Sequence, residues 1–198
     1  MKKILAAILV LILAAFSFAA LGESIPTDVS GLWHAYLADG ESTLFLRVDG
    51  TGSLMVGESS YNVAWSQSGS ALILDQGGAL VEGVCEEDLI SLDIGGGNLV
   101  FFRELPEPMP LDCDLTGVWR APLPGGDSML TLNADGAAIM NLGPEAVSLT
   151  WTHDGASVTL FQDGYPIDCV FDGVFISIFL GEGSICFIPD AMPAAVAP

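Results

Sequence analysis

Residues 31–37, GLWHAYL, decide the fold, because they return in the same chain as residues 117–123, GVWRAPL. The offset of 86 positions holds without a gap for the turn residues and aromatic residues that follow. A fixed spacing across such different residue types indicates that one supersecondary unit occurs twice. The pairs that carry the repeat are Gly31 and Gly117, Trp33 and Trp119, Asp49 and Asp135, Gly50 and Gly136, Trp65 and Trp151, Gly69 and Gly155, Gly78 and Gly164, Ile90 and Ile176, Ser91 and Ser177, Gly95 and Gly181, and Phe101 and Phe187.

Each copy is a series of short apolar runs separated by turn residues. Asp49-Gly50 and Gly77-Gly78 are examples of turns whose glycines supply the positive φ angles that tight hairpins need. Regular spacing of this kind predicts an antiparallel meander of eight strands in each copy. In the first copy the predicted strands are 31–37, 43–48, 53–56, 62–65, 71–74, 79–85, 89–94 and 98–103.

Alternation along these strands identifies the inward face, since successive side chains of a strand point to opposite sides. The residues predicted to point inward are Trp33, Ala35, Leu37, Leu44, Leu46, Trp65, Leu72, Leu74, Ile90, Leu92 and Phe101. The opposite faces carry Arg47, Glu82, Glu86 and Asp93. A sheet that is apolar on one side only can bury that side by closing into a barrel, which also removes its exposed edges. We therefore predict an all-β protein of two tandem, small, eight-stranded up-and-down antiparallel β-barrels.

Gly31-x-Trp33 on the first strand, together with Arg103 at the end of the last strand, resembles the signature of lipocalins and the wider calycin group. The resemblance implies that Trp33 closes one end of a barrel and that Arg103 packs across its indole. The second copy has Gly117-x-Trp119 but Pro189 in place of the arginine, so its closing contact is expected to differ.

The interior of so small a barrel is either filled by side chains or holds one small ligand. Lipocalins with roomy interiors use longer strands, as the resemblance implies, and this favours a filled interior here. If a ligand binds, the predicted ligand-binding residues are the inward aromatic residues, namely Trp33, Trp65, Phe101, Trp119 and Trp151. The predicted function is non-enzymatic binding of a small apolar ligand or an extracellular partner. The alternative is an envelope-associated structural, adhesion or inhibitor module without a ligand.

The first 22 residues have the features of a signal peptide, with Lys2 and Lys3 before an apolar run and small residues after it. An uncleaved anchor is the alternative, since the run is almost long enough to cross a bilayer. No cysteine follows the run, so a lipid-modified terminus is not supported. The prediction is an exported, bacterial-type protein with barrels at 27–104 and 113–190, a Pro-rich linker at 105–112 and a disordered tail at 191–198.

The formal charge of −20 limits the partners. Removal of the leader would leave Arg47, Arg103 and Arg120 as the only strong cations against 25 acidic residues. Nucleic acid and anionic lipid surfaces are bound mainly through Lys and Arg, so we expect neither nucleic-acid binding nor stable membrane insertion after cleavage of the leader.

No set of residues indicates catalysis, a metal or another cofactor. His34 and His153 do not occupy equivalent positions, and no serine nucleophile motif is present. Cys85, Cys113, Cys169 and Cys186 have no zinc-type spacing and also lie at non-equivalent positions. Their redox state stays open, because an even number of cysteines permits either free thiols or disulfides.

Residues 174–180, VFISIFL, are apolar on both faces. Alternation places Ile176, Ile178 and Leu180 inside and leaves Phe175 and Phe179 outside. Outward aromatic residues close to one another often mark an interface. We predict that Phe175 and Phe179 pack against the first barrel.

Overall fold

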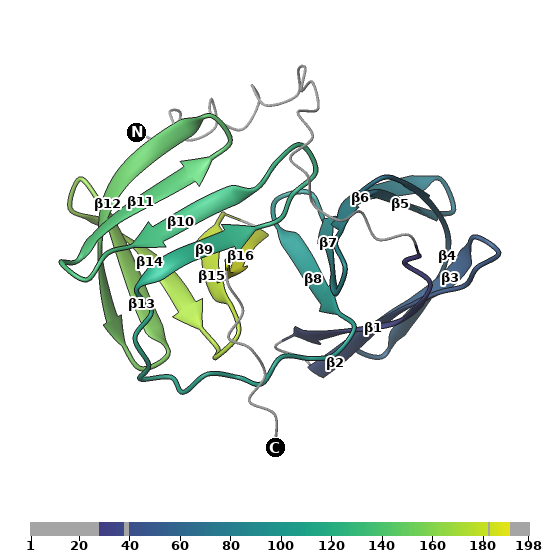
Figure 1. Cartoon of the computed structure of the whole chain (residues 1–198), viewed down its shortest axis with the longest axis horizontal. Coiled ribbons are helices and arrows are strands. Elements are labelled where there is room, and N and C mark those ends of the chain that lie inside the picture. Colours follow the sequence, from purple (N-terminus) through teal and green to yellow (C-terminus); the bar gives the residue numbers. More distant parts are fainter. Residues whose placement is uncertain (1–27, 38–39, 182, 191–198) are drawn as a thin grey trace.

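The computed structural model describes residues 28–37, 40–181 and 183–190. They form two closed eight-stranded antiparallel barrels that follow one another in the chain (Figure 1). The predicted signal peptide at 1–22 and tail at 191–198 lie outside the described residues. Among the described residues, no helix is long and apolar enough to cross a bilayer.

Both barrels follow the up-and-down order, with the first strand pairing with the last. The first barrel contains β1 (Gly31–Leu37), β2 (Gly40–Leu46), β3 (Thr51–Val56), β4 (Ser59–Ser68), β5 (Ala71–Gln76), β6 (Ala79–Cys85), β7 (Leu89–Asp93) and β8 (Asn98–Phe102). The second contains β9 (Gly117–Ala121), β10 (Ser128–Leu132), β11 (Ala137–Leu142), β12 (Glu145–Asp154), β13 (Ser157–Gln162), β14 (Tyr165–Phe171), β15 (Ile176–Leu180) and β16 (Gly183–Pro189). The predicted all-β fold with two tandem barrels is confirmed.

The turn between β2 and β3 shows how the repeated residues act locally. The carboxylate of Asp49 accepts hydrogen bonds from the backbone N–H and the hydroxyl of Thr51, at 3.0 and 2.6 Å. In the second barrel Asp135 accepts from the backbone N–H of Ala137 at 3.0 Å. Gly50 and its equivalent Gly136 adopt positive φ angles of 82° and 83°, which side chains disfavour. The repeated Asp-Gly pair therefore fixes the same hairpin in both barrels.

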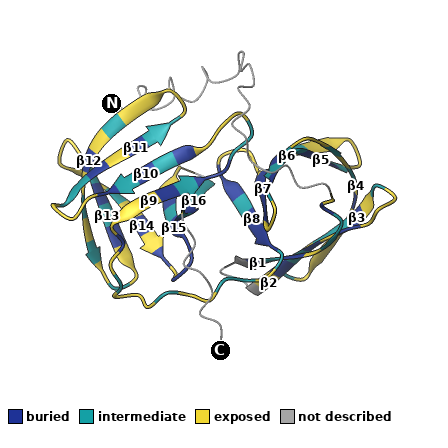
Figure 2. Cartoon of the chain, in the orientation of Figure 1, coloured by how far each residue is buried: buried dark blue, intermediate teal, exposed yellow. Residues whose placement is uncertain are grey.

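Each barrel has its own packed core (Figure 2). Of the eleven residues predicted to point inward in the first barrel, nine are no more than 2% exposed and Trp65 is half-buried, while the side chain of Leu37 is not among those described. Equivalent positions are buried in the second barrel, where Leu130, Leu160 and Ile178 are fully covered. The prediction that Leu180 lies inside the barrel is wrong, because its side chain is 39% exposed. It is the last residue of β15, where the strand has already reached the end of the barrel.

The two barrels contact one another through equivalent hairpins, β7–β8 and β15–β16. A shared apolar cluster contains three pairs of equivalent residues, which are Leu89 and Phe175, Val100 and Cys186, and Phe102 and Ile188. The rings of Phe102 and Phe175 lie 5.8 Å apart. The same face of each repeat thus binds its counterpart, as in a two-fold symmetric dimer.

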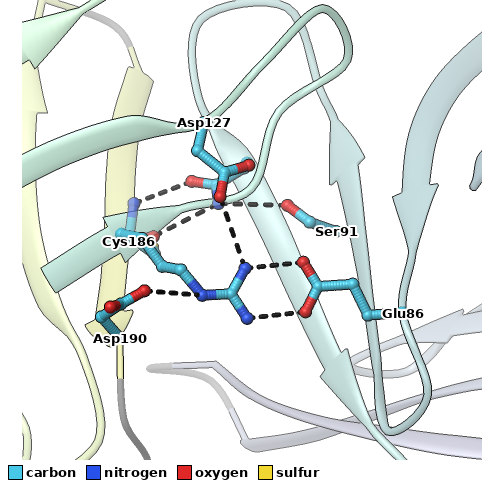
Figure 3. A network of polar contacts seen from close by, with 7 residues as sticks. Glu86, Ser91, Asp127, Cys186 and Asp190 are labelled. Carbon is cyan, nitrogen blue, oxygen red and sulfur yellow. Dashed lines mark hydrogen bonds and ion pairs between the residues drawn. The ribbon is translucent and has the colours of Figure 1, made fainter. Parts of the chain in front are cut away.

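Backbone and side-chain contacts specify how the hairpins meet. A Cβ atom on Gly97 would lie 1.9 Å from the carbonyl oxygen of Ser184, and one on the equivalent Gly183 would lie 1.9 Å from that of Gly96. Only glycine permits this approach. The buried amide of Asn98 donates to the carbonyl of Cys186 at 3.3 Å and accepts from its N–H at 2.8 Å (Figure 3).

An ion pair joins the barrels beside this cluster. Both terminal nitrogens of Arg120 donate to the carboxylate of Glu86 at 2.6 Å, while Asp127 and Asp190 lie 3.6 Å from the guanidinium (Figure 3). The hydrogen bonds that Arg120 donates to Glu86 raise the pKa of Arg120 above its usual range. Glu86 was expected to face solvent, so its position at the contact between the barrels was not anticipated.

The segment between the barrels is held against the second one. The N–H of Met109 donates to the carbonyl of Gly173 at 2.8 Å. Gly173 has a φ of 98°, and a Cβ atom there would lie 2.8 Å from Pro108. Met109 and Cys113 also pack on the second core. The connecting segment is therefore anchored to the second barrel at these residues.

Phe175 and Phe179 form a matched pair for testing the contact between the barrels. Phe175 is 5% exposed in the shared cluster, whereas Phe179 is 53% exposed and is not part of it. We expect Phe175→Ala to lower the free energy of unfolding by about 3 kcal/mol and to increase the radius of gyration. Phe179→Ala should change the free energy by less than about 0.5 kcal/mol. Thermal unfolding and small-angle X-ray scattering measure both effects, and equal responses from the two variants would contradict the assignment.

Candidate functional site

One end of the first barrel, here called the Trp end, is closed by Trp33. Its indole N–H donates to the carbonyl of Val29 at 2.9 Å, and the side chain is fully buried. The guanidinium carbon of Arg103 lies 4.1 Å from the centroid of its ring. Arg103 also donates to the carbonyls of Asp28 and Ser30, at 2.8 and 3.2 Å. The arginine therefore connects the start of the barrel to its last strand.

Gly31 is required by this arrangement. Its φ is 122°, and a Cβ atom would lie 3.3 Å from a terminal nitrogen of Arg103. Gly117 in the second barrel also has a positive φ, 136°, but open space surrounds its Cβ position. The two glycines share a backbone conformation, while only the first is also crowded by an arginine.

The second barrel closes its Trp end differently. The indole of Trp119 donates to the carbonyl of Leu115 at 2.9 Å, as Trp33 does to Val29. The ring of Phe171 meets the Trp119 ring edge to face at 6.0 Å. Phe171 stands where the first barrel has Cys85, and Pro189 stands where it has Arg103. The tryptophan of the second barrel is thus contacted by an aromatic ring, whereas that of the first barrel is contacted by an arginine.

Trp65 and Trp151 stabilise equivalent turns. The indole N–H of Trp65 donates to the carbonyls of Arg47 and Thr51, at 2.9 and 3.1 Å, and that of Trp151 donates to Asn133 at 2.9 Å. All four indole N–H groups therefore bind backbone carbonyls. Phe101 is fully buried in the core. All five residues that were predicted to contact a ligand therefore make contacts within the protein.

The opposite end of the first barrel, here called the distal end, contains an unusual polar group. Ser42, on β2, lies on the inward face opposite Ala35 and is fully buried. Its hydroxyl has no hydrogen-bond partner and is the only such side-chain atom among the described residues. A buried hydroxyl without a partner is costly and marks a place where a water or ligand atom belongs.

Several inward-pointing apolar side chains of the first barrel are not fully covered. They are called the distal apolar set and comprise Leu54, Tyr61, Val81 and Leu99. Leu54 lies opposite both Leu44 and Tyr61, while Val81 lies opposite Leu74 and Leu99 opposite Leu92, so all four share the face of the core. Tyr61 is 38% exposed. The packed interior therefore reaches the surface at this end.

The distal end of the second barrel is more completely covered. Met140, which stands in the position of Leu54, is 5% exposed, whereas Leu54 is only partly buried. Ser128, in the position of Ser42, is also buried, at 4% exposed. Val147, Ile167 and Ile185 occupy the remaining equivalent positions and are partly buried. The first barrel is the better candidate for a binding site because Leu54 and Tyr61 are more exposed than their equivalents Met140 and Val147.

The sequence did not lead us to the distal end, because we took the inward aromatic residues as the candidate ligand contacts. The available signal was Ser42 itself, since it repeats as Ser128 at an inward position of both copies. A polar residue that recurs on a core face requires a partner, and this would have drawn attention to it.

The histidines do not gather catalytic groups. His34 contacts Glu41 at 2.6 Å on the outside of the first barrel. His153 lies in the second barrel, where its Nε2 contacts the carbonyl of Gly155 at 2.5 Å, just as Gln67 binds the carbonyl of the equivalent Gly69. Within the described residues, no group of His, Cys, Asp and Glu side chains is arranged to hold a metal.

All four cysteines are free thiols. Burial raises the pKa of Cys85 and of Cys169 to about 11 and also raises that of Cys113 and Cys186. A thiol is a nucleophile only as the thiolate, so Cys85 and Cys169 are poorly reactive near neutral pH.

Comparisons with protein-family models, curated protein sequences and solved structures found no match for this chain. The class is therefore defined by the structure. Two closed eight-stranded antiparallel barrels in tandem fit a calycin-like barrel fold.

Arg103 and Arg47 test the closure of the first barrel. Arg103→Ala removes a cation–π contact and the hydrogen bonds to Asp28 and Ser30, so we expect the free energy of unfolding to fall by about 2 kcal/mol. Arg47 is exposed and lies 5.1 Å from the Phe45 ring, so Arg47→Ala should cost about 0.5 kcal/mol. Urea unfolding measures both values. A larger loss for Arg47→Ala would exclude the proposed closing role.

Thiol labelling tests the burial of the cysteines. With a pKa of about 11, Cys85 and Cys169 have about one thiolate per thousand molecules at pH 8, and labelling should accelerate as the pH rises toward 11. We expect an aromatic disulfide reagent at pH 8 to modify Cys113 first and to reach Cys85 and Cys169 only when guanidinium unfolds the protein. Rapid labelling of all four thiols in the native state would contradict this expectation.

Proposed function

We propose that this protein is a non-enzymatic binding protein that takes a small apolar ligand at the distal end of its first barrel. The supporting observation is the buried hydroxyl of Ser42, which lacks a partner on an otherwise apolar inward face. A ligand with an apolar body and one hydrogen-bonding group would satisfy the hydroxyl and cover the distal apolar set. We also propose that the chain is a lipocalin, because Gly31, Trp33 and Arg103 resemble the lipocalin signature.

The location of the site differs from the one predicted from the sequence. Trp33 and Phe101 are fully buried, and the indole N–H groups of Trp65 and Trp33 are already bonded. A ligand at the distal end would leave these contacts intact. It would bind at the surface of the packed core instead of replacing its centre.

The alternative function is an extracellular interaction module that works through its outer surface without a small ligand. Exposed apolar side chains such as Leu80 and Phe179 favour this alternative, at 66% and 53% exposed. Export through the predicted leader is part of both proposals, as is the absence of catalysis, of a cofactor, of nucleic-acid binding and of stable membrane insertion.

Neighbouring residues on opposite faces of β6 provide the experiment. Val81 points into the barrel, and Leu80 points outward. We expect the full-length protein to enhance the fluorescence of the neutral apolar probe N-phenyl-1-naphthylamine. Val81→Arg should weaken the binding of the probe more than tenfold by placing an unpaired charge among apolar side chains, and Leu80→Arg should leave it unchanged.

Circular dichroism of both variants checks that the barrels remain folded. If Val81→Arg unfolds the protein, Val81→Asn provides a milder polar change at the same position. An unmodified protein that does not bind the probe, or equal weakening by substitutions on both faces, would favour the interaction module instead.

A further inference from the structure

Among the described residues, the charged side chains at the turns of the distal end of the first barrel are acidic, and none is a lysine or an arginine. Glu41 lies beside the start of β2, Glu58 lies in the turn between β3 and β4, and Asp93 ends β7. All three are exposed. In an up-and-down barrel these positions lie at the same end, because alternate turns return to it. The two arginines of the first barrel, Arg47 and Arg103, lie at the Trp end.

The side chains at this rim leave negative charge toward solvent. The carboxylate of Asp93 accepts the N–H of Gly95 at 2.8 Å, and that of Glu41 contacts His34 at 2.6 Å. Neither contact is with a lysine or an arginine. An apolar end surrounded by carboxylates attracts positive charge and repels negative charge.

Ser42 lies at the same end of the first barrel as this rim. It is the residue after Glu41 on β2, it is fully buried, and its oxygen has no partner. A hydroxyl oxygen can accept a hydrogen bond from an ammonium group. The buried hydroxyl requires a hydrogen-bonding group, and the acidic rim favours one that carries positive charge.

We propose that the ligand of the first barrel is a cationic amphiphile, an amine with a compact apolar body. Its ammonium group donates to the Ser42 hydroxyl and is attracted by Glu41, Glu58 and Asp93, and its apolar body contacts the distal apolar set. This inference rests on the proposed function and adds the charge of the ligand to it.

Three probes of equal chain length separate the two proposals. Octylamine, octanol and octanoate are positive, neutral and negative at pH 7. In the full-length protein we expect octylamine to displace N-phenyl-1-naphthylamine at the lowest concentration and octanoate at the highest. The preference should shrink as salt is added. If octanol binds as tightly as octylamine, the cationic ligand is excluded while the binding function stands. If none of the three displaces the probe and none binds by calorimetry, both are excluded.

A matched pair of triple variants tests where the charge acts. Neutralising the rim with Glu41→Gln, Glu58→Gln and Asp93→Asn should weaken octylamine binding about five- to tenfold and leave octanol binding unchanged. Asparagine at position 93 can still accept from Gly95. Glu87→Gln, Asp88→Asn and Glu104→Gln remove the same charge near the Trp end and should weaken octylamine binding less than twofold. Equal effects of the two triple variants would exclude the rim as the source of selectivity.

The Ser42→Ala variant distinguishes a binding role of Ser42 from a purely structural one. The substitution removes a buried hydroxyl that has no partner in the free protein, so the melting temperature should rise or stay unchanged. Octylamine affinity should fall about fivefold, since the ammonium loses its acceptor. A fall in melting temperature with unchanged octylamine affinity would overturn the role of Ser42 in binding.

Discussion

Closure of each barrel depends on a short seam between its first and last strands. In the first barrel the register between β1 and β8 consists of the pair His34 and Phe102, whereas the other strand pairs share three or more. Arg103 compensates for this short ladder, since it stacks on Trp33 and donates to backbone carbonyls before β1 and after β6. Loss of the seam would expose the edges of two strands and open the core.

In the second barrel, backbone pairing instead of an arginine holds the first and last strands together. Its seam includes the pairs Ile188 with Arg120 and Pro189 with Trp119, and the N–H of Asp190 extends it to the carbonyl of Val118. Arg120 is thereby free to join the barrels through Glu86. The two copies therefore use their arginines differently, one to close a barrel and the other to connect two barrels. The contact between equivalent hairpins is that of a self-complementary pair held in one chain, which limits how far either hairpin can diverge.

The sequence predicted the fold well where the chemistry is local. Strands β1 and β6 have the predicted bounds, because turn residues delimit them and the alternation of apolar side chains is unbroken. β4 is longer than predicted, since its first residues are polar and extend beyond the core. The exposure of Leu180 could not be anticipated, because alternation gives the face of a strand but not where the core ends along it. The pairing of Glu86 with Arg120 depends on how the barrels dock, which no periodicity encodes.

The candidate site was less predictable, because residues of the same type serve different purposes at the two ends of the barrel. Large aromatic side chains suggest a ligand site, yet here they fill the Trp end and donate their N–H groups to turns and to the segment before the first strand. A barrel of such short strands has little interior left once these side chains are in place. What remains is the distal end, where the first barrel keeps Leu54 and Tyr61 incompletely covered and the second buries Met140. An unpaired hydroxyl in an otherwise apolar core is destabilising, and a binding role for Ser42 explains why it is tolerated there.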